Sequence, residues 1–428
     1  MKKILLVPLL IGMIALLTLD AFSQNVLQIS TCHEKAIEHS PLQKQILYLE
    51  TISQLNSDGY KAINYPKLIL NGQATYQSDV FSLPFPVPGI DSPIIPQEQY
   101  KIAVDFYQNI YNGGASKSAR EIEEARKQAE LQALEVSFHQ IREVVNSLYF
   151  GILKAQEQVK LIQNVQQDMN NQKNVMEARI SEGAVLPISA KILEKEIISL
   201  EQQLIELESV RSSLLIMLGK WLEEPLDGNT TLEVPETDVN GEITLNRPES
   251  KQFASQIDLL ESQKSQLAVS RIPDIGLFGT AGVGNPNPLN WFDVQFTPYW
   301  LAGIRLSWNI LDYGKASNNR EVLGLQQQSL MAAKDNFERS VDIGITKQES
   351  DILKFELLIE KDLQIVKIQE EIVAVSSSQL ANGVINSNDY VLEVNRGLNA
   401  NISLRLHQID LAKTKIELLT STGNIEKL

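Results

Sequence analysis

The side chains that most often carry chemistry are few and scattered in this sequence. The four histidines, His33, His39, His139 and His407, show no His-x-x-x-His or Glu-x-x-His spacing, which would place two metal ligands on one helix face. The single cysteine, Cys32, precedes His33, but adjacent helical residues point in different directions, so no thiolate–imidazole pair is expected. Gly279, Gly282 and Gly284 lack the Lys-Ser/Thr end of a phosphate-binding loop. We therefore expect no enzyme activity, no metal and no cofactor.

The composition is that of a folded, acidic protein. Of 428 residues 43% are hydrophobic, and 53 acidic residues against 38 basic ones give a net charge of −15. A surface of this sign repels phosphate and argues against nucleic-acid binding. One cysteine excludes a disulfide scaffold, so stability must come from packing or assembly.

The N-terminus has the pattern of a secretory signal peptide at residues 1–23. Lys2 and Lys3 precede an apolar run from Ile4 to Leu19, and a small-residue cleavage site ends at Ser23. A permanent membrane anchor is the alternative interpretation of this run. No later segment approaches the roughly 20 apolar residues of a spanning helix, so any further membrane part is predicted to consist of β-strands.

The chain contains two copies of one unit. Residues 109–114 (Asn-Ile-Tyr-Asn-Gly-Gly) recur 200 positions later as residues 309–314 (Asn-Ile-Leu-Asp-Tyr-Gly), and the same offset joins Gly183 to Gly383. Pro66 and Gly72 match Pro273 and Gly279 at a similar offset. We place the first repeat at residues 24–220, a linker at 221–247 and the second repeat at 248–428.

Each repeat is predicted to contain a long helix, at 115–182 and 315–381, and a return helix, at 188–220 and 387–420. The heptad seam of the first long helix is almost wholly apolar, which is typical of a coiled coil. In the second, one seam column carries Gln348, Asp362 and Gln369, which suggests a wet space beside the helix. At about 1.5 Å per residue the long helices measure roughly 100 Å. Shorter amphipathic helices, at 34–61 and 248–271, open the repeats.

Two strands are predicted before each long helix, at about 66–79 and 100–111, and at about 273–283 and 301–312. Apolar and polar residues alternate in them, as Ile102 and Val104 do with Lys101 and Asp105. Strands of about 10 residues with this pattern fit a transmembrane β-barrel, and the same pattern fits a half-buried soluble sheet. The aromatic residues Trp291, Tyr299 and Trp300 are candidates for the membrane interface and favour the barrel.

Four strands cannot close a barrel, because the smallest common transmembrane barrels have about eight. Open strand edges are not tolerated in lipid, so the chain is expected to assemble with copies of itself. A dimer would supply eight strands and a trimer twelve, and the strand count alone does not choose between them.

The strand-to-helix motif with Gly113, Gly114 and Gly314, the turn glycines Gly183 and Gly383, and the Leu218-Gly219 ending together resemble the TolC family of outer-membrane efflux proteins of Gram-negative bacteria. The resemblance covers nearly the whole mature length. It implies a mainly α protein with a transmembrane β part. Three chains would form a twelve-stranded β-barrel continuous with a twelve-helix periplasmic α-barrel, with residues 221–247 at the equator.

The resemblance also implies how such a protein works. A homotrimer in outer-membrane lipid would conduct substrates passively, docked to a periplasmic adaptor (membrane fusion) protein and an inner-membrane RND or ABC pump. The system would serve efflux or type I secretion. The excess of acidic residues predicts a tunnel that favours cations.

The family's periplasmic gate is matched only in part. Acidic gate residues lie six and nine positions after the second turn glycine, where this chain has Asp389 and Leu392, with Glu393 displaced by one. The basic gate residue two positions after that glycine is replaced by Ile385. We expect Asp389, with Glu393 as a further candidate, to form a carboxylate ring. The alternative is an ordinary acidic residue in the first turn of a helix.

Glycines at 183 and 383 mark the ends of the long helices. The resemblance implies that these tips, including Val185 and Val384, contact the adaptor. Two rival classes are a periplasmic coiled-coil adaptor or scaffold, which would have one hairpin flanked by β-domains, and a secreted hydrolase, whose catalytic residues are missing. The sequence does not identify the cargo.

Overall fold

The computed structural model describes residues 26–81, 94–237, 239 and 244–427. The predicted signal peptide lies outside these residues. The chain divides into two compact units, one built from residues through Gln43 with Leu134–Pro248 and Asn336–Leu428, the other from Lys44–Ala133 and Glu249–Asp335. These units do not coincide with the sequence repeats, because both long helices contribute to each unit. They are α4 (Ala115–Ser181) and α7 (Lys315–Ala381).

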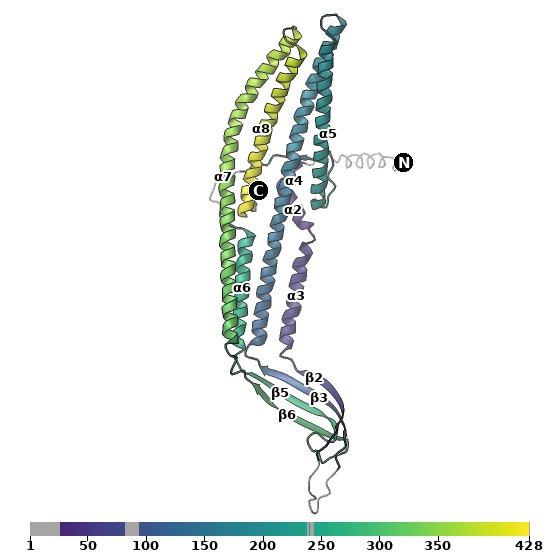
Figure 1. Ribbon diagram of the computed structural model, residues 1–428, viewed down its shortest axis with the longest axis vertical. Helices are drawn as coiled ribbons and strands as arrows, with labels where there is room; N and C mark the ends of the chain where they lie inside the picture. The colour runs from purple at the N-terminus through teal and green to yellow at the C-terminus, as the bar shows by residue number, and fades with distance from the viewer. Residues whose placement is uncertain (1–25, 82–93, 238, 240–243, 428) are drawn as a thin grey trace, which may run out of the picture. The chain divides into compact units, whose positions relative to one another are not determined.

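The first unit is helical. It combines the second parts of α4 and α7 with α2 (Ile29–Glu38), α5 (Ile188–Leu222), α8 (Ser387–Thr422) and the short helix η1 (Ile425–Lys427). A small parallel sheet pairs β1 (Val26–Leu27) with β4 (Thr231–Leu232). In Figure 1, α4 with α5 and α7 with α8 form two helical hairpins.

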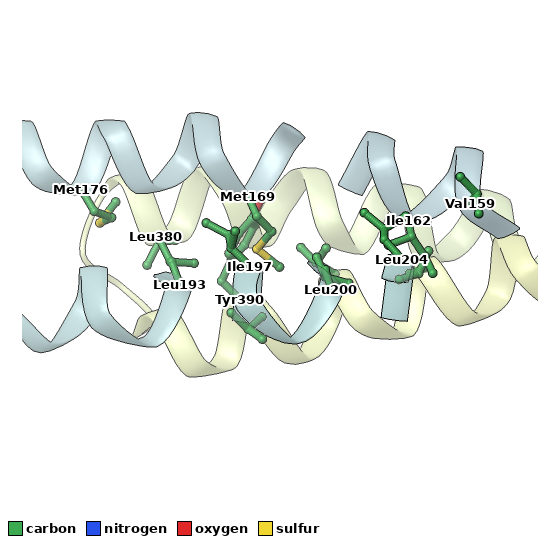
Figure 2. Packing of buried hydrophobic residues seen from close by; sticks show 13 residues of the cluster. Val159, Ile162, Met169, Met176, Leu193, Ile197, Leu200, Leu204, Leu380 and Tyr390 are labelled. Carbon is green, nitrogen blue, oxygen red and sulfur yellow. The ribbon is translucent and has the colours of Figure 1, made fainter. Parts of the chain in front are cut away.

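Apolar side chains from both hairpins form the core near the hairpin ends. Met169 and Met176 of α4 and Leu193 and Leu200 of α5 are fully or almost fully buried, and Leu380 and Tyr390 join them from α7 and α8. Figure 2 shows these side chains pointing toward one another between the helices. The apolar heptad seam of the first long helix is therefore a buried surface.

The second unit is built on a sheet. Its strands are β2 (Lys67–Tyr76), β3 (Glu98–Tyr111), β5 (Asp274–Asn285) and β6 (Thr297–Ser307), all antiparallel in the order β2-β3-β5-β6 (Figure 1). The helices α3 (Gln43–Ala62) and α6 (Pro248–Val269) and the first parts of α4 and α7 belong to the same unit. None of the helices in the described part of the chain is both long enough and apolar enough to cross a membrane.

Two predicted elements differ from the structure. The helix expected at 34–61 is two helices, α2 and α3, separated at residues 39–42. Pro41 explains the break, because proline lacks an N–H and disfavours helical geometry in the residue before it. The strand expected at 301–312 runs from Thr297 to Ser307. Its last pair is Ser307 with Asp274, and β5 begins there, so residues 308–312 have no strand beside them.

Candidate functional site

One face of the four-stranded sheet is apolar from edge to edge. The register places apolar side chains side by side across all four strands, and every one except Ile275 is exposed. Leu68, Ile304 and Trp300 have exposed fractions of 72%, 71% and 75%. This apolar face consists of Leu68, Leu70, Ala74 and Tyr76 of β2, Tyr100, Ile102, Val104 and Phe106 of β3, Ile275, Leu277, Ala281 and Val283 of β5, and Trp300, Ala302, Ile304 and Leu306 of β6.

The opposite face of the sheet is polar and cross-linked by side chains. The Asp105 carboxylate accepts hydrogen bonds of 2.5 Å from both Asn71 of β2 and Thr280 of β5. The Lys101 ammonium lies 5.8 Å from the ring centre of Tyr299. The cations Lys67, Lys101 and Arg305 share this polar face with the anions Asp105 and Asp274. The acidic excess of the whole chain is therefore not found on this face.

The predicted interfacial aromatic residues divide between different surroundings. Trp300 lies on the apolar face, and Trp291, 58% exposed, lies in the β5–β6 connection with its indole N–H donating to the Pro288 carbonyl. Tyr299 lies on the polar face and is only 6% exposed. Tyr299 and Trp300 lie on opposite faces because successive strand residues point to opposite faces.

The strand-to-helix junctions require left-handed backbone. Gly113, Gly114 and Gly314 have φ of 63°, 89° and 83°, a region that favours glycine. A Cβ on Gly113 would lie 2.7 Å from Cβ of Ile272, so this position has no room for a side chain. The equivalent residue of the second repeat is Tyr313, which adopts φ of 49° and is 93% exposed.

Both hairpin tips end their long helix in the same way. Gly183 and Gly383 have φ of 76° and 74°, and each is followed by a hydrogen bond that closes the last turn, from Ala184 N to Arg179 O and from Val384 N to Gln379 O. This is the Schellman arrangement. The prediction that these glycines end the helices is confirmed.

The residues after the two glycines differ in exposure. Val185 and Ile385, equivalent in the two repeats, are partly buried against the hydrophobic core. Val384 is 69% exposed and Leu186 is 73% exposed. Leu186 and Val384 therefore present more apolar surface to solvent at the tips than Val185 does.

The gate candidates lie at the start of α8 in different settings. Asp389 is exposed in the first turn, and its backbone N–H, with that of Asn388, donates to the side chain of the helix cap Asn386. The Glu393 carboxylate lies 2.6 Å from Arg396 and accepts a 3.0 Å hydrogen bond from Gln369. Asp389 is available for a carboxylate ring, whereas Glu393 is engaged with its own chain.

The polar seam residues of α7 form a ladder to α8, which sequence reasoning missed. The Ser421 hydroxyl donates to Gln348 at 2.7 Å, His407 Nδ1 lies 2.5 Å from the Asp362 carboxylate, and Gln369 bonds to Glu393. The expectation of a wet space was wrong here, because the polar groups contact α8 side chains and Asp362 is 9% exposed.

A second buried network, also missed, joins three helices of the first unit. His33 Nε2 lies 2.7 Å from the Asn146 Oδ1, and the Asn146 amide donates to the Thr420 hydroxyl at 3.0 Å. Burial lowers the pKa of His33 from 6.5 to about 4, so the imidazole is neutral. The adjacent Cys32 thiol is fully buried, and burial raises its pKa to about 12, which removes its nucleophilicity. No metal-binding group of three or more His, Cys, Asp or Glu side chains occurs among the residues that the structure describes.

Comparison with known proteins gives structural matches only. No family model matches the chain, and no curated protein matches it. The outer membrane protein VceC from Vibrio cholerae is similar with a TM-score of 0.67 at 15% identity, over 92% of this chain and 96% of that one. The Campylobacter jejuni CmeC outer membrane channel gives 0.67 at 13% identity, over 92% and 85% of the two chains. The MtrE outer membrane channel of Neisseria gonorrhoeae, in its open state, gives 0.66 at 15%, over 92% and 88%. At these identities the matches show a shared fold, so the chain has the fold of outer-membrane channels.

Proposed function

We propose that this protein is an outer-membrane channel that continues into the periplasm as a helical tunnel and conducts substrates passively to the cell exterior. The observation that carries the proposal is the exposed apolar face of the sheet. An apolar surface as extended as this one is unusual on a soluble protein and marks an interaction with another protein or with lipid. A polar opposite face, bonded across strands, fits the water-filled side of a barrel.

The open edges of the sheet support a homotrimer. In the described chain the order β2-β3-β5-β6 leaves β2 and β6 each with one strand neighbour. In hydrocarbon these edges must pair, and copies of the same chain offer the matching edges. Twelve strands from three chains agree with the architecture implied by the resemblance to the TolC family.

The helical hairpins support the periplasmic part of the proposal. Two helices of 67 residues each are far longer than a globular core of this size requires. They end in tips that present Leu186 and Val384. In the proposed assembly these tips dock to a periplasmic adaptor, and an inner-membrane RND or ABC pump supplies the energy.

Planar-bilayer recording tests the channel. The mature protein, purified in detergent and shown to be a folded trimer by circular dichroism and light scattering, should give discrete conductance steps at nanomolar concentration. The matched control is Ile304→Asp with Val104→Asp, which places charges on the apolar face and should prevent insertion while leaving the helical content intact. A folded trimer that gives no conductance would refute the proposal.

Cysteine crosslinking tests the docking of the tips. With Cys32 replaced by alanine, Leu186→Cys or Val384→Cys should form a covalent product with a periplasmic adaptor protein of the same bacterium when the two are produced together. Val185→Cys is the matched control, because its side chain packs against the core and should react more slowly. Equal labelling at all three positions, or none at any, would contradict the predicted contact.

A further inference from the structure

The sheet pairs its strands in the same register in both repeats. Leu70 pairs with Val104 in β2–β3, and the residues 207 and 200 positions later, Leu277 and Ile304, pair in β5–β6. The pairs at the strand ends have the same offsets, because Lys67 pairs with Tyr107 in the first repeat and the equivalent residues, Asp274 and Ser307, pair in the second. The two strand pairs are therefore structural equivalents, residue by residue.

The seam between the repeats, β3–β5, joins the second strand of the first repeat to the first strand of the second repeat. On the apolar face it places Phe106 opposite Gly279 and Val104 opposite Ala281. The remaining second strand, β6, and the remaining first strand, β2, are the two edges of the sheet. An assembly that continues the internal repeat must join β6 of one copy to β2 of the next in the same way.

We infer that β6 of one copy pairs with β2 of another in the register of the internal β3–β5 seam. This inference rests on the proposed function and specifies its subunit contact. Each residue of β3 is replaced by its equivalent in β6, 200 positions later, and each residue of β5 by its equivalent in β2, 207 positions earlier. The seam pair Phe106–Gly279 then becomes Leu306 opposite Gly72, and Val104–Ala281 becomes Ile304 opposite Ala74. The next pair on the same face is Ala302 opposite Tyr76.

Side-chain size supports this register. Each apolar pair places a large side chain against a small one, Leu306 against Gly72, Ile304 against Ala74 and Tyr76 against Ala302. Sliding β2 by two residues one way places Ile304 against Tyr76. A two-residue shift in the opposite direction places two large side chains, Leu306 and Leu70, against each other and two small ones, Ala302 and Ala74, against each other. Directly opposed side chains lie about 5 Å apart, so these pairs would interact across the seam. The inferred register repeats in its first two pairs the large-against-small order of the internal seam, Phe106 against Gly279 and Val104 against Ala281.

The polar face agrees with the same register. The converted pairs there are Arg305 with Gln73, Ser307 with Asn71 and Gly303 with Thr75. Arg305 thus takes the place of Asp105, which in the internal seam bonds Thr280. The guanidinium can donate to the Gln73 amide oxygen as the carboxylate accepts from the threonine. A slip by one residue would bring polar side chains to the apolar face.

Disulfide mapping in the assembled protein tests the register. In a Cys32→Ala background, Ile304→Cys with Ala74→Cys is oxidised with copper phenanthroline in native outer membranes, and a short dithiol crosslinker is applied in parallel. We expect non-reduced denaturing gels to show dimer and trimer bands at least tenfold stronger than for Ile304→Cys with Gly72→Cys or with Tyr76→Cys. Val104→Cys with Ala281→Cys is the internal control, because its crosslink joins residues of one chain and adds no mass.

The outcomes separate this inference from the proposed function. Strong bands for a shifted pair, or no bands for any pair in a conducting trimer, would overturn the register and leave the channel standing. Bilayer conductance of each double variant shows that the barrel has formed. If the unmodified protein forms no trimer and gives no conductance, the proposed channel function itself is refuted.

Discussion

Lowering the pH from 7 to 5 should loosen helix α2 through one buried histidine. His33 is 3% exposed and bonds Asn146, which in turn bonds Thr420 of α8. In the packed state its pKa is lowered from 6.5 to about 4, chiefly because burial disfavours the charged imidazolium. The detached helix can take up a proton below about pH 6.5, whereas the packed helix cannot until about pH 4.

The sign and size of the effect follow from these two pKa values. Packing is fully favourable above about pH 6.5 and weakens as the pH falls, because protons bind the detached state first. Between pH 7 and pH 5 the free energy holding α2 should fall by about 2 kcal/mol. The equilibrium constant for opening α2 should therefore rise roughly 20-fold.

Hydrogen exchange of the α2 amides measures this opening directly. After correction for the intrinsic exchange rate, protection of residues 29–38 should drop by the expected factor at pH 5. His33→Gln keeps an N–H donor for Asn146 but cannot titrate, so its protection should be insensitive to this pH change. If the wild type and His33→Gln respond equally to pH, His33 is not the group responsible.

Three further predictions concern the gate, the tips and the core. Asp389→Asn should lower the cation-to-anion permeability ratio in bilayer recordings, and an unchanged reversal potential would exclude the carboxylate ring. Gly183→Ala should destabilise the tip by about 1 kcal/mol, because φ of 76° strains an alanine although nothing lies within 4 Å of the new methyl group. Hydrogen exchange at the tip checks this, and wild-type protection would contradict it. Leu200→Ala, at a side chain only 1% exposed, should cost about 2–5 kcal/mol. Denaturant unfolding of the helices measures that loss, and a midpoint equal to wild type would show that the cluster does not hold the hairpins together.

Elements set by local pattern could be read from the sequence. The helix ends follow glycines whose left-handed φ is a local property, so Gly183 and Gly383 mark them directly. The strand β6 was misplaced because its end depends on where β5 begins, which is a matter of pairing. The break at Pro41 was a local signal that the apolar periodicity on either side concealed.

The site was harder to predict than the fold because its contacts join distant segments. Polar seam residues such as Asp362 indicate water or a partner equally well, and only the fold brings His407 of α8 against it. His33, Asn146 and Thr420 have no sequence spacing that could have linked them. Tyr299 was assigned by its residue type, although the alternation of the strand already placed it on the face opposite Trp300.

The glycines of β5 have a consequence for how the two repeats can change over evolution. A Cβ at Gly282 would overlap the Ile102 carbonyl oxygen, and one at Gly276 would lie 2.8 Å from the Tyr107 hydroxyl. The equivalent positions in β2 hold Thr75 and Ile69. A gene encoding a single repeat would have to use one strand sequence for every seam. The inner seam, β3–β5, therefore depends on glycines that the equivalent positions of the edge strand β2 do not keep, so two repeats of different sequence can line their two seams differently.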